Sequence, residues 1–255
     1  MVVIGVISAK GGVGKTTVTS NLSSALVKFF GKKVLAVDGN ITTPNLGIHF
    51  GMLSQENTLN EVLEDKIEVT QAIYIHPSGV HILPASLSAT VEYPDVMKLK
   101  EKIDEVKDNY DYVIIDGAAG IGREVLATIK ASDKILLVSN PDMAAVVSMI
   151  KARKIVQILN TYLYGLILNR VEGKKYEMKK ERIEELSEVR IIGEIPFDKK
   201  IIESISKMVP LVLLDGRARA SRVFKKIAAE ISQEVFIEKE SIWDKIIRFL
   251  RLRKI

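Results

Sequence analysis

Cysteine is absent from the 255 residues of this sequence. The chain therefore forms no disulfide bond, which fits a reducing compartment such as the cytosol. It also holds no iron–sulfur cluster, because proteins bind these clusters through cysteine thiolates. Apolar stretches are short, and none approaches the roughly 20 residues that a membrane-spanning helix requires. The first apolar segment shows neither a basic start nor a cleavage site, so we expect no signal peptide and a cytoplasmic protein.

Excess charge is also missing from most of the chain. The formal net charge is only +5, and residues 241–255 contain five basic residues and one acidic residue. Almost all of the positive excess therefore lies in this last segment. The chain is 47% hydrophobic and long enough for one well-buried domain. We find neither internal repeats nor low-complexity tracts, and we expect a domain over residues 1–235, a tether over 236–240 and a separate segment over 241–255.

A glycine-rich stretch lies between the first predicted strand and the first predicted helix. Residues 2–7 are short, β-branched and continuously apolar, which predicts a buried parallel strand. Residues 17–30 have a helical pattern that ends near Gly31. Glycines between a strand and a helix allow backbone N–H groups to face a phosphate, and the helix N-terminus adds a positive end. The context therefore predicts a phosphate-binding loop.

The spacing within this loop matches a Walker A motif. The matching positions are Gly11, Gly14, Lys15 and Thr16. We expect Lys15 to reach the β- and γ-phosphates of a nucleotide and the Thr16 hydroxyl to bind Mg²⁺. The complete set of expected nucleotide ligands in the loop is Gly11, Gly12, Val13, Gly14, Lys15, Thr16 and Thr17.

A second lysine, Lys10, stands at the head of the loop and gives Lys-Gly-Gly-Val-Gly-Lys-Thr. This motif resembles the deviant Walker A motif of the MinD/ParA ATPases. The resemblance covers almost the whole chain and is closest to MinD. It implies that Lys10 crosses a dimer interface to contact the partner's ATP. It also implies ATP and Mg²⁺ as cofactors, and ATP hydrolysis.

Alternation of strand and helix patterns along the chain predicts the fold class. We expect an α/β, doubly wound, mainly parallel sheet with helices on both faces, as in P-loop NTPases. Further strands are expected over residues 80–83 and 134–138, and helices over 58–65, 94–109, 143–159, 177–186 and 218–236, with another helical turn over 69–74. In the helix over 58–65, Thr58 and Glu61 form a capping box.

Aspartates follow two of the predicted strands. Asp38 follows the strand over residues 33–37, and Asp116 ends the strand over 110–117. Open α/β sheets bind ligands at the carboxyl ends of their strands. We therefore expect both carboxylates beside Mg²⁺, together with Thr16.

Residues 38–47, which follow the second strand, resemble the switch I segment of the family. The family has Asp-x-Asp followed by Asn-Leu, and Asn40 stands here in place of the second aspartate. That aspartate is thought to help position the attacking water. An amide can hydrogen-bond a water, but it is a very poor base and has no charge. Our hypothesis is that ATP binding and dimerisation persist while turnover is slow; the alternative is a neutral replacement.

Two strand ends resemble the base-binding segments of the family. Asn169 and Arg170 follow the strand over residues 163–168, and Pro196-Phe197-Asp198 follows the strand over 191–195. The resemblance implies that Asn169 recognises adenine, that Arg170 packs nearby, and that Pro196 and Asp198 close over the base. An asparagine amide can both donate and accept, as adenine requires.

Basic residues occur together in the helix over 143–159, at Lys151, Arg153 and Lys154. A solvated helix face is the favoured interpretation. Contact with nucleic acid or with a second copy of the chain is the alternative.

Residues 241–255 have the pattern of an amphipathic helix. The apolar face contains Ile242, Trp243, Ile246, Ile247, Phe249 and Leu250, and the opposite face contains Lys245, Arg248 and Arg251. Such a pattern is typical of a helix that lies in a membrane interface. MinD proteins end in a comparable membrane-targeting helix, so the resemblance implies an anionic membrane surface as a partner. Packing on the parent domain or in a partner's groove and non-specific DNA binding are the alternatives.

Three functions are compatible with these features. The first is a MinD-like ATPase that forms a homodimer with ATP and docks reversibly on the inner face of the cell membrane. There it would position the division machinery or another cargo through an unidentified regulatory protein. The second is a ParA-like or flagellar-number regulator that acts on DNA or on a transcriptional regulator, although nucleic acid is the less favoured partner. The third is a nucleotide-held scaffold that barely hydrolyses ATP.

Overall fold

The computed structural model describes residues 1–88 and 94–236. The amphipathic segment over 241–255 and nearly all of the expected tether lie outside the described residues.

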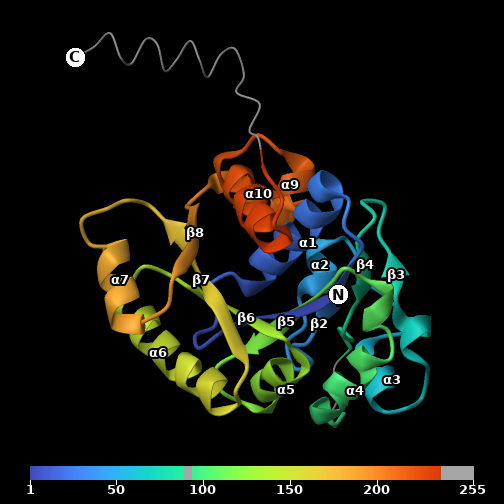
Figure 1. Cartoon of the computed structure of the whole chain (residues 1–255). Helices are drawn as coiled ribbons and strands as arrows, with labels where there is room; N and C mark the ends of the chain where they lie inside the picture. Colours follow the sequence, from blue (N-terminus) through green and yellow to red (C-terminus); the bar gives the residue numbers. More distant parts are fainter. Residues whose placement is uncertain (89–93, 237–255) are drawn as a thin grey trace.

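A twisted sheet forms the centre of the molecule (Figure 1). The described residues form an eight-stranded sheet in the order β3-β4-β2-β5-β1-β6-β7-β8. The strands are β1 (Val2–Ser8), β2 (Val34–Asp38), β3 (Tyr74–Ile75), β4 (His81–Leu83), β5 (Tyr112–Ala119), β6 (Lys134–Ser139), β7 (Tyr162–Val171) and β8 (Ile191–Pro196). All neighbours pair in parallel except β3 and β4. The predicted mainly parallel sheet is confirmed.

Helices cover both faces of this sheet. They are α1 (Lys15–Phe30), α2 (Leu46–His49), α3 (Leu59–Leu63), α4 (Leu99–Asp104), α5 (Arg123–Ala131), α6 (Met143–Ile158), α7 (Lys180–Ser187), α8 (Lys199–Ser206), α9 (Leu211–Leu214) and α10 (Arg219–Ser232). One core joins α1, α9 and α10 to the sheet. Two further cores on the opposite face contain α3 to α7. Both layers are visible in Figure 1.

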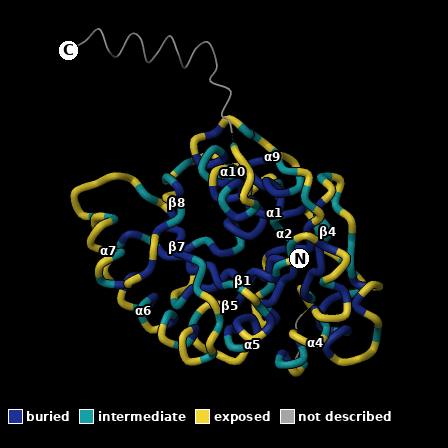
Figure 2. The backbone as a smooth tube through the Cα atoms, in the orientation of Figure 1, coloured by how far each residue is buried: buried dark blue, intermediate teal, exposed yellow. Residues whose placement is uncertain are grey.

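The alternation of side chains along β1 explains why helices must pack on both faces of the sheet. Ile4 and Val6 pack in the core with α1, whereas Val3 and Ile7 pack in the cores on the other face. Successive side chains of a strand point to opposite faces, so a continuously apolar strand is stable only when both faces are covered. Figure 2 shows the central strands as a buried layer inside an exposed shell.

Several predicted boundaries differ from the structure. The helix expected over 94–109 is divided into a 3₁₀ turn at Val96–Lys98, α4, and a second 3₁₀ turn at Lys107–Asn109. Its four apolar residues Val96, Leu99, Ile103 and Val106 are nevertheless buried. The apolar face is therefore kept although the helix is interrupted. Tertiary packing often overrides local helix propensity in this way.

Other helix ends shift for identifiable local reasons. The helix expected over 177–186 begins only at Lys180, because the Glu177 carboxylate accepts N–H groups from the turn before it. The helix expected over 218–236 ends at Ser232, where Gln233 takes the left-handed conformation with φ 56°. The helical turn expected over 69–74 is a 3₁₀ turn at Val69–Ala72, after which β3 begins. The capping box of Thr58 and Glu61 is present as predicted.

Candidate nucleotide site

The predicted phosphate loop connects β1 to α1 in the centre of the sheet. The chain places β2 to β5 on one side of β1 and β6 to β8 on the other. Open α/β sheets bind ligands at such a reversal of winding. Gly14 precedes α1 with φ 98°, and a Cβ added to it would lie 2.1 Å from Asn169 Nδ2. Glycine is therefore required here both for its conformation and for the close approach of another side chain.

The loop faces a polar cavity of about 290 Å³. Its lining contains residues of the phosphate loop and of switch I, together with His49, Ala119 and Arg170. The residues are Gly11, Gly12, Gly14, Lys15, Thr16, Thr17, Asn40, Thr43, Asn45, His49, Ala119 and Arg170. Lys10 lies exposed at the start of the loop. A polar cavity beside a glycine loop and a helix N-terminus has the properties of a phosphate site.

A second, more apolar cavity of about 300 Å³ adjoins the first. Both cavities are lined by Gly14, Thr17 and Arg170. The second also collects the predicted base-binding residues Asn169, Pro196 and Asp198, together with Phe197 and three isoleucines of α8, Ile201, Ile202 and Ile205. A polar cavity joined to an apolar one fits phosphates joined to a base. Sequence reasoning missed the α8 isoleucines, although their helical spacing could have indicated an apolar face.

Asn169 is tied to the phosphate loop. Its side chain is 4% exposed. Its Nδ2 donates to the carbonyl of Val13 at 2.7 Å, and its Oδ1 accepts the Arg170 N–H at 2.9 Å. Arg170 itself has φ 59°, and non-glycine residues in this conformation cluster at functional sites. Asn169 therefore positions the loop, a role beyond the adenine contact that the resemblance implies.

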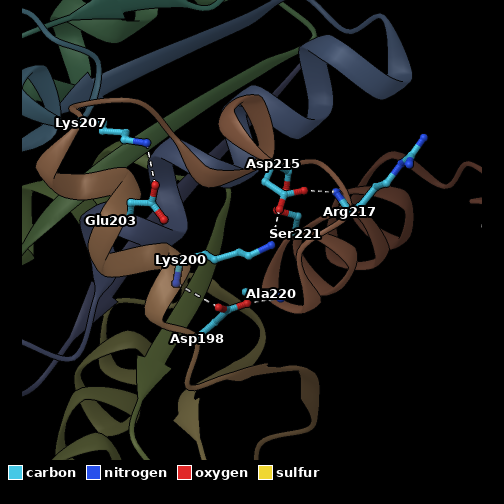
Figure 3. A network of polar contacts seen from close by, with 8 residues as sticks. All are labelled: Asp198, Lys200, Glu203, Lys207, Asp215, Arg217, Ala220 and Ser221. Atoms are coloured by element: carbon cyan, nitrogen blue, oxygen red, sulfur yellow. Dashed lines mark hydrogen bonds and ion pairs between the residues drawn. The ribbon is translucent and has the colours of Figure 1, made fainter.

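Asp198 holds one wall of the apolar cavity in place (Figure 3). Its carboxylate accepts the Lys200 N–H at 3.0 Å, which caps α8, and the Ala220 N–H at 3.5 Å in the first turn of α10. Lys200 Nζ also pairs with Asp215 at 2.5 Å. These contacts fix α8 against the start of α10. The predicted residue Asp198 thus lines the cavity, and its carboxylate caps the helix beside the base site.

The two predicted metal-binding aspartates lie opposite each other on neighbouring strands. Asp38 of β2 pairs in register with Asp116 of β5, and each side chain is 1% exposed. Asp116 accepts the hydroxyl of Thr16 at 2.6 Å and that of Thr19 at 3.1 Å. We expected Asp116 at a strand end, but β5 continues to Ala119. The strand continues because Ala119 still pairs with Ser8 of β1. Sequence reasoning missed Thr19.

Asp38 also organises switch I. Its carboxylate accepts the backbone N–H groups of Asn40 at 3.3 Å, Asn45 at 3.0 Å and Leu46 at 2.9 Å. These bonds stabilise the charged carboxylate and draw the loop around it.

Burial sets the electrostatics of the site. Desolvation raises the pKa of Asp116 to about 6, although hydrogen bonds and Lys15 oppose this shift. Desolvation and the neighbouring Asp116 raise the pKa of Asp38 well above its usual range. Burial lowers the pKa of Lys15, and Asp116 opposes that change. Two buried carboxylates beside a hydroxyl are hard oxygen ligands that need a cation, and they fit Mg²⁺, which typically binds one or two carboxylates together with substrate phosphates.

Asn40 is oriented by its own loop. Its Nδ2 donates to Thr43 O at 2.5 Å and to Thr43 Oγ1 at 3.0 Å. The amide thus closes the switch I turn at the edge of the phosphate cavity. His49, which sequence reasoning missed, also lines this cavity, and burial lowers its pKa to about 4. At neutral pH the His49 ring is uncharged and can offer only a hydrogen bond to a ligand.

The basic residues of α6 have separate roles. Arg153 donates to Ser187 O at 2.6 Å and pairs with Glu188 at 2.6 Å, which fixes α6 against α7. Lys151 and Lys154 are exposed. Arg153 therefore belongs to the contact between α6 and α7, and the solvated-face interpretation of Lys151 and Lys154 stays a prediction. Among residues 1–88 and 94–236, no helix has both the length and the apolar composition needed to cross a membrane.

Comparison with known proteins identifies relatives of this chain. A family model described as an AAA domain matches residues 1–164. An uncharacterised ATP-binding protein of Methanocaldococcus jannaschii is 38% identical over 98% of both chains. Septum site-determining protein MinD of Thermotoga maritima is 33% identical over 91% of this chain and 88% of its own length. The antiactivator FleN of Pseudomonas aeruginosa is 28% identical over 90% of this chain and 85% of its own length.

Solved structures agree with these relatives. The cell division ATPase MinD of Pyrococcus furiosus has a TM-score of 0.85 and 33% identity, and covers 91% of this chain and 98% of its own. MinD of Pyrococcus horikoshii, complexed with Mg-ADP, has a TM-score of 0.85 and 32% identity over 91% and 96% of the two chains. The MinC:MinD complex of Aquifex aeolicus matches with a TM-score of 0.83 and 28% identity over 94% and 99%. On this sequence, fold and site, the chain belongs to the MinD/ParA family of P-loop ATPases and is close to MinD.

Proposed function

We propose that this chain is a MinD-like ATPase that binds ATP and Mg²⁺, dimerises around the nucleotide and docks reversibly on a membrane. The observation that carries the proposal is the pair of adjoining cavities at the phosphate loop, with Lys10 exposed beside them. The Mg-ADP complex of the P. horikoshii relative supports the choice of cofactors. The family assignment supports ATP hydrolysis.

Residues of the phosphate loop, the metal site and α8 have separate roles in the proposed mechanism. Backbone N–H groups of residues 11–16 and the Lys15 ammonium would hold the phosphates. A bound Mg²⁺ would neutralise phosphate charge, held by Thr16 with Asp116 and Asp38 beside it. Asp38 keeps switch I ordered through its backbone contacts. The α8 isoleucines would exclude water from the base.

In the proposed dimer, Lys10 of one copy contacts the ATP bound by the other copy. Of the two lysines in the loop, Lys10 is exposed and Lys15 is buried, so Lys10 is the one that can reach a second copy. We expect Lys10→Ala to bind ATP but to weaken the ATP-dependent dimer about tenfold or more, since a charged hydrogen bond contributes roughly 1.5–3 kcal/mol. Size-exclusion chromatography with light scattering, with and without ATP and Mg²⁺, measures this. Lys130→Ala, a similarly exposed lysine on α5, is the control. A wild-type chain that stays monomeric with saturating ATP would refute the proposal.

Asn40 is expected to limit turnover. In Asn40→Asp the carboxylate still accepts from the Thr43 N–H and hydroxyl, and it loses the bonds that the amide donates to Thr43. It adds a negative charge at the edge of the cavity, where it can orient and polarise water. Positioned proton acceptors contribute 10²-fold or more in favourable cases, and we expect ATP turnover to rise about tenfold. Asn45→Asp adds the same charge to the same loop and is the control. Equal rates for Asn40→Asp and wild type would show that the replacement is neutral.

Two candidate functions differ in what the ATP-bound protein binds. We propose that residues 1–235 form the ATPase domain, 236–240 a tether, and 241–255 a membrane-targeting helix that places the protein on the inner face of the cell membrane. The A. aeolicus MinC:MinD complex supports a partner protein as cargo in division-site positioning. The similarity to FleN supports the second candidate, a regulator acting on DNA or on a transcriptional regulator. Binding to anionic vesicles and to duplex DNA, each with and without ATP, separates the two.

A further inference from the structure

A small exposed surface at the end of the described chain combines lysines with apolar side chains. We call it the tail-root patch, and it consists of Lys28, Phe29, Lys225, Val235 and Phe236. Phe29 is 37% exposed and Val235 is 83% exposed. Neither the nucleotide cavities nor the internal cores use these two side chains.

Cations and rings alternate across this patch. Lys225 Nζ lies 4.6 Å from the centre of the Phe29 ring and 5.3 Å from that of Phe236, while Lys28 Nζ lies 5.8 Å from Phe29. Phe236 packs edge-on against Phe30 at 6.4 Å. The nearby Glu234 is paired with Lys32 at 2.8 Å, so its charge is compensated. Lys28 is exposed, so the patch presents a positive charge next to the exposed side chains of Phe29 and Val235.

The patch lies at the C-terminal end of α1, whereas the phosphate loop lies at its N-terminal end. Helix α1 begins at the phosphate loop and ends at Phe30 after 16 residues, which corresponds to about 24 Å at 1.5 Å per residue. α10 packs beside α1 in the same core and leads to Val235 and Phe236 (Figure 1). A surface so far from the phosphate loop remains accessible when a second copy covers the loop.

Chain length places the patch beside the proposed membrane helix. Residues 237–240 separate Phe236 from Ser241, and the five Cα–Cα steps between these two residues span at most about 18 Å. A helix over 241–255 lying on a bilayer would therefore hold the patch close to the headgroups, at a high effective concentration.

We propose that the tail-root patch is a second lipid-contacting surface, through which the folded domain itself binds anionic headgroups; this rests on the membrane docking proposed above. Lysine with exposed aromatic and aliphatic side chains is the chemistry of membrane interfaces. Docking of residues 241–255 onto the patch is disfavoured, because that segment has five basic residues against one acidic residue. Like charges would meet there, whereas anionic lipid complements both surfaces.

The absence of cysteine makes a direct test possible. Lys28→Cys introduces a single thiol into the full-length chain, which can be labelled with a polarity-sensitive fluorophore. Vesicles of phosphatidylcholine and phosphatidylglycerol in equal parts are added with ATP and Mg²⁺. We expect increased, blue-shifted emission from the label at 28. The same label at Lys151→Cys, on the opposite face of the sheet, is expected to stay unchanged. Emission from the unmodified Trp243 reports insertion of the tail.

Charge reversal gives a second measurement. Lys28→Glu is expected to weaken vesicle binding at least fivefold, since one basic residue near an anionic surface contributes about fivefold in affinity. Lys151→Glu is the matched control and is expected to bind as wild type. If Trp243 enters the vesicles while the label at 28 stays unchanged and Lys28→Glu binds normally, the patch proposal is wrong but membrane docking stands. Stronger binding by Lys28→Glu would indicate release of a docked tail and would also overturn it. If wild type does not bind vesicles with ATP, both proposals fail.

Discussion

Gly14→Ala is expected to lose nucleotide binding almost completely. The added Cβ would lie 2.1 Å from Asn169 Nδ2 while φ stays at 98°, so the loop and Asn169 must both move. Overpacking and backbone strain each cost roughly 1–3 kcal/mol, and a loss of about 3 kcal/mol corresponds to roughly 100-fold in affinity. Displacing Asn169 would also break its bond to Val13 O, which holds the loop. Titration with a fluorescent ATP analogue measures the affinity.

A control separates this effect from a general loss of stability. Gly173→Ala also places alanine at a positive φ, 73°, but its Cβ would meet nothing within 4 Å. We expect Gly173→Ala to lower the free energy of unfolding by about 1 kcal/mol, measured by urea denaturation, with ATP affinity unchanged. Normal ATP affinity in folded Gly14→Ala would show that the close packing of Asn169 against the loop is unimportant for binding.

Deletion of residues 241–255 is expected to abolish sedimentation with anionic vesicles. The segment contains five basic residues, each contributing about 1 kcal/mol near an anionic surface, in addition to its apolar face. Two copies on one dimer multiply this attraction through effective concentration. Loss of the segment therefore removes far more affinity than any single substitution in the tail-root patch. Co-sedimentation with phosphatidylglycerol vesicles, with and without ATP and Mg²⁺, measures it.

The truncated chain is expected to retain its nucleotide chemistry. All residues that line the two cavities lie between Gly11 and Ile205, far from the deleted segment in sequence. ATP affinity and ATP-dependent dimerisation should therefore match wild type, which serves as the folding control. ATP-dependent sedimentation that persists after truncation would contradict the assignment of the tail as the principal anchor.

Local patterns explain which parts of the site could be predicted. The phosphate loop depends on neighbouring residues, Gly11 to Thr16, whose spacing has a chemical meaning before folding. The capping box of Thr58 and Glu61 likewise depends on residues three apart. By contrast, α8 and its isoleucine wall lacked a strong motif, and their role depends on Asp198 and α10. The exact extent of β5 beyond Asp116 depended on pairing with β1.

The sequence alone determined the phosphate loop and the alternation of strands and helices, because these follow from short-range spacing and periodicity. It also carried the motif residues, such as Lys10 and Lys15, on which the family resemblance rests. Only the tertiary structure decided how distant groups meet. Asn169 binds the loop carbonyl of Val13 across 156 positions of sequence, and Thr16 binds Asp116 across 100. The register that sets Asp38 opposite Asp116 is likewise a property of the folded sheet. The physical reason is that such contacts depend on strand order and side-chain packing, which local sequence patterns do not encode.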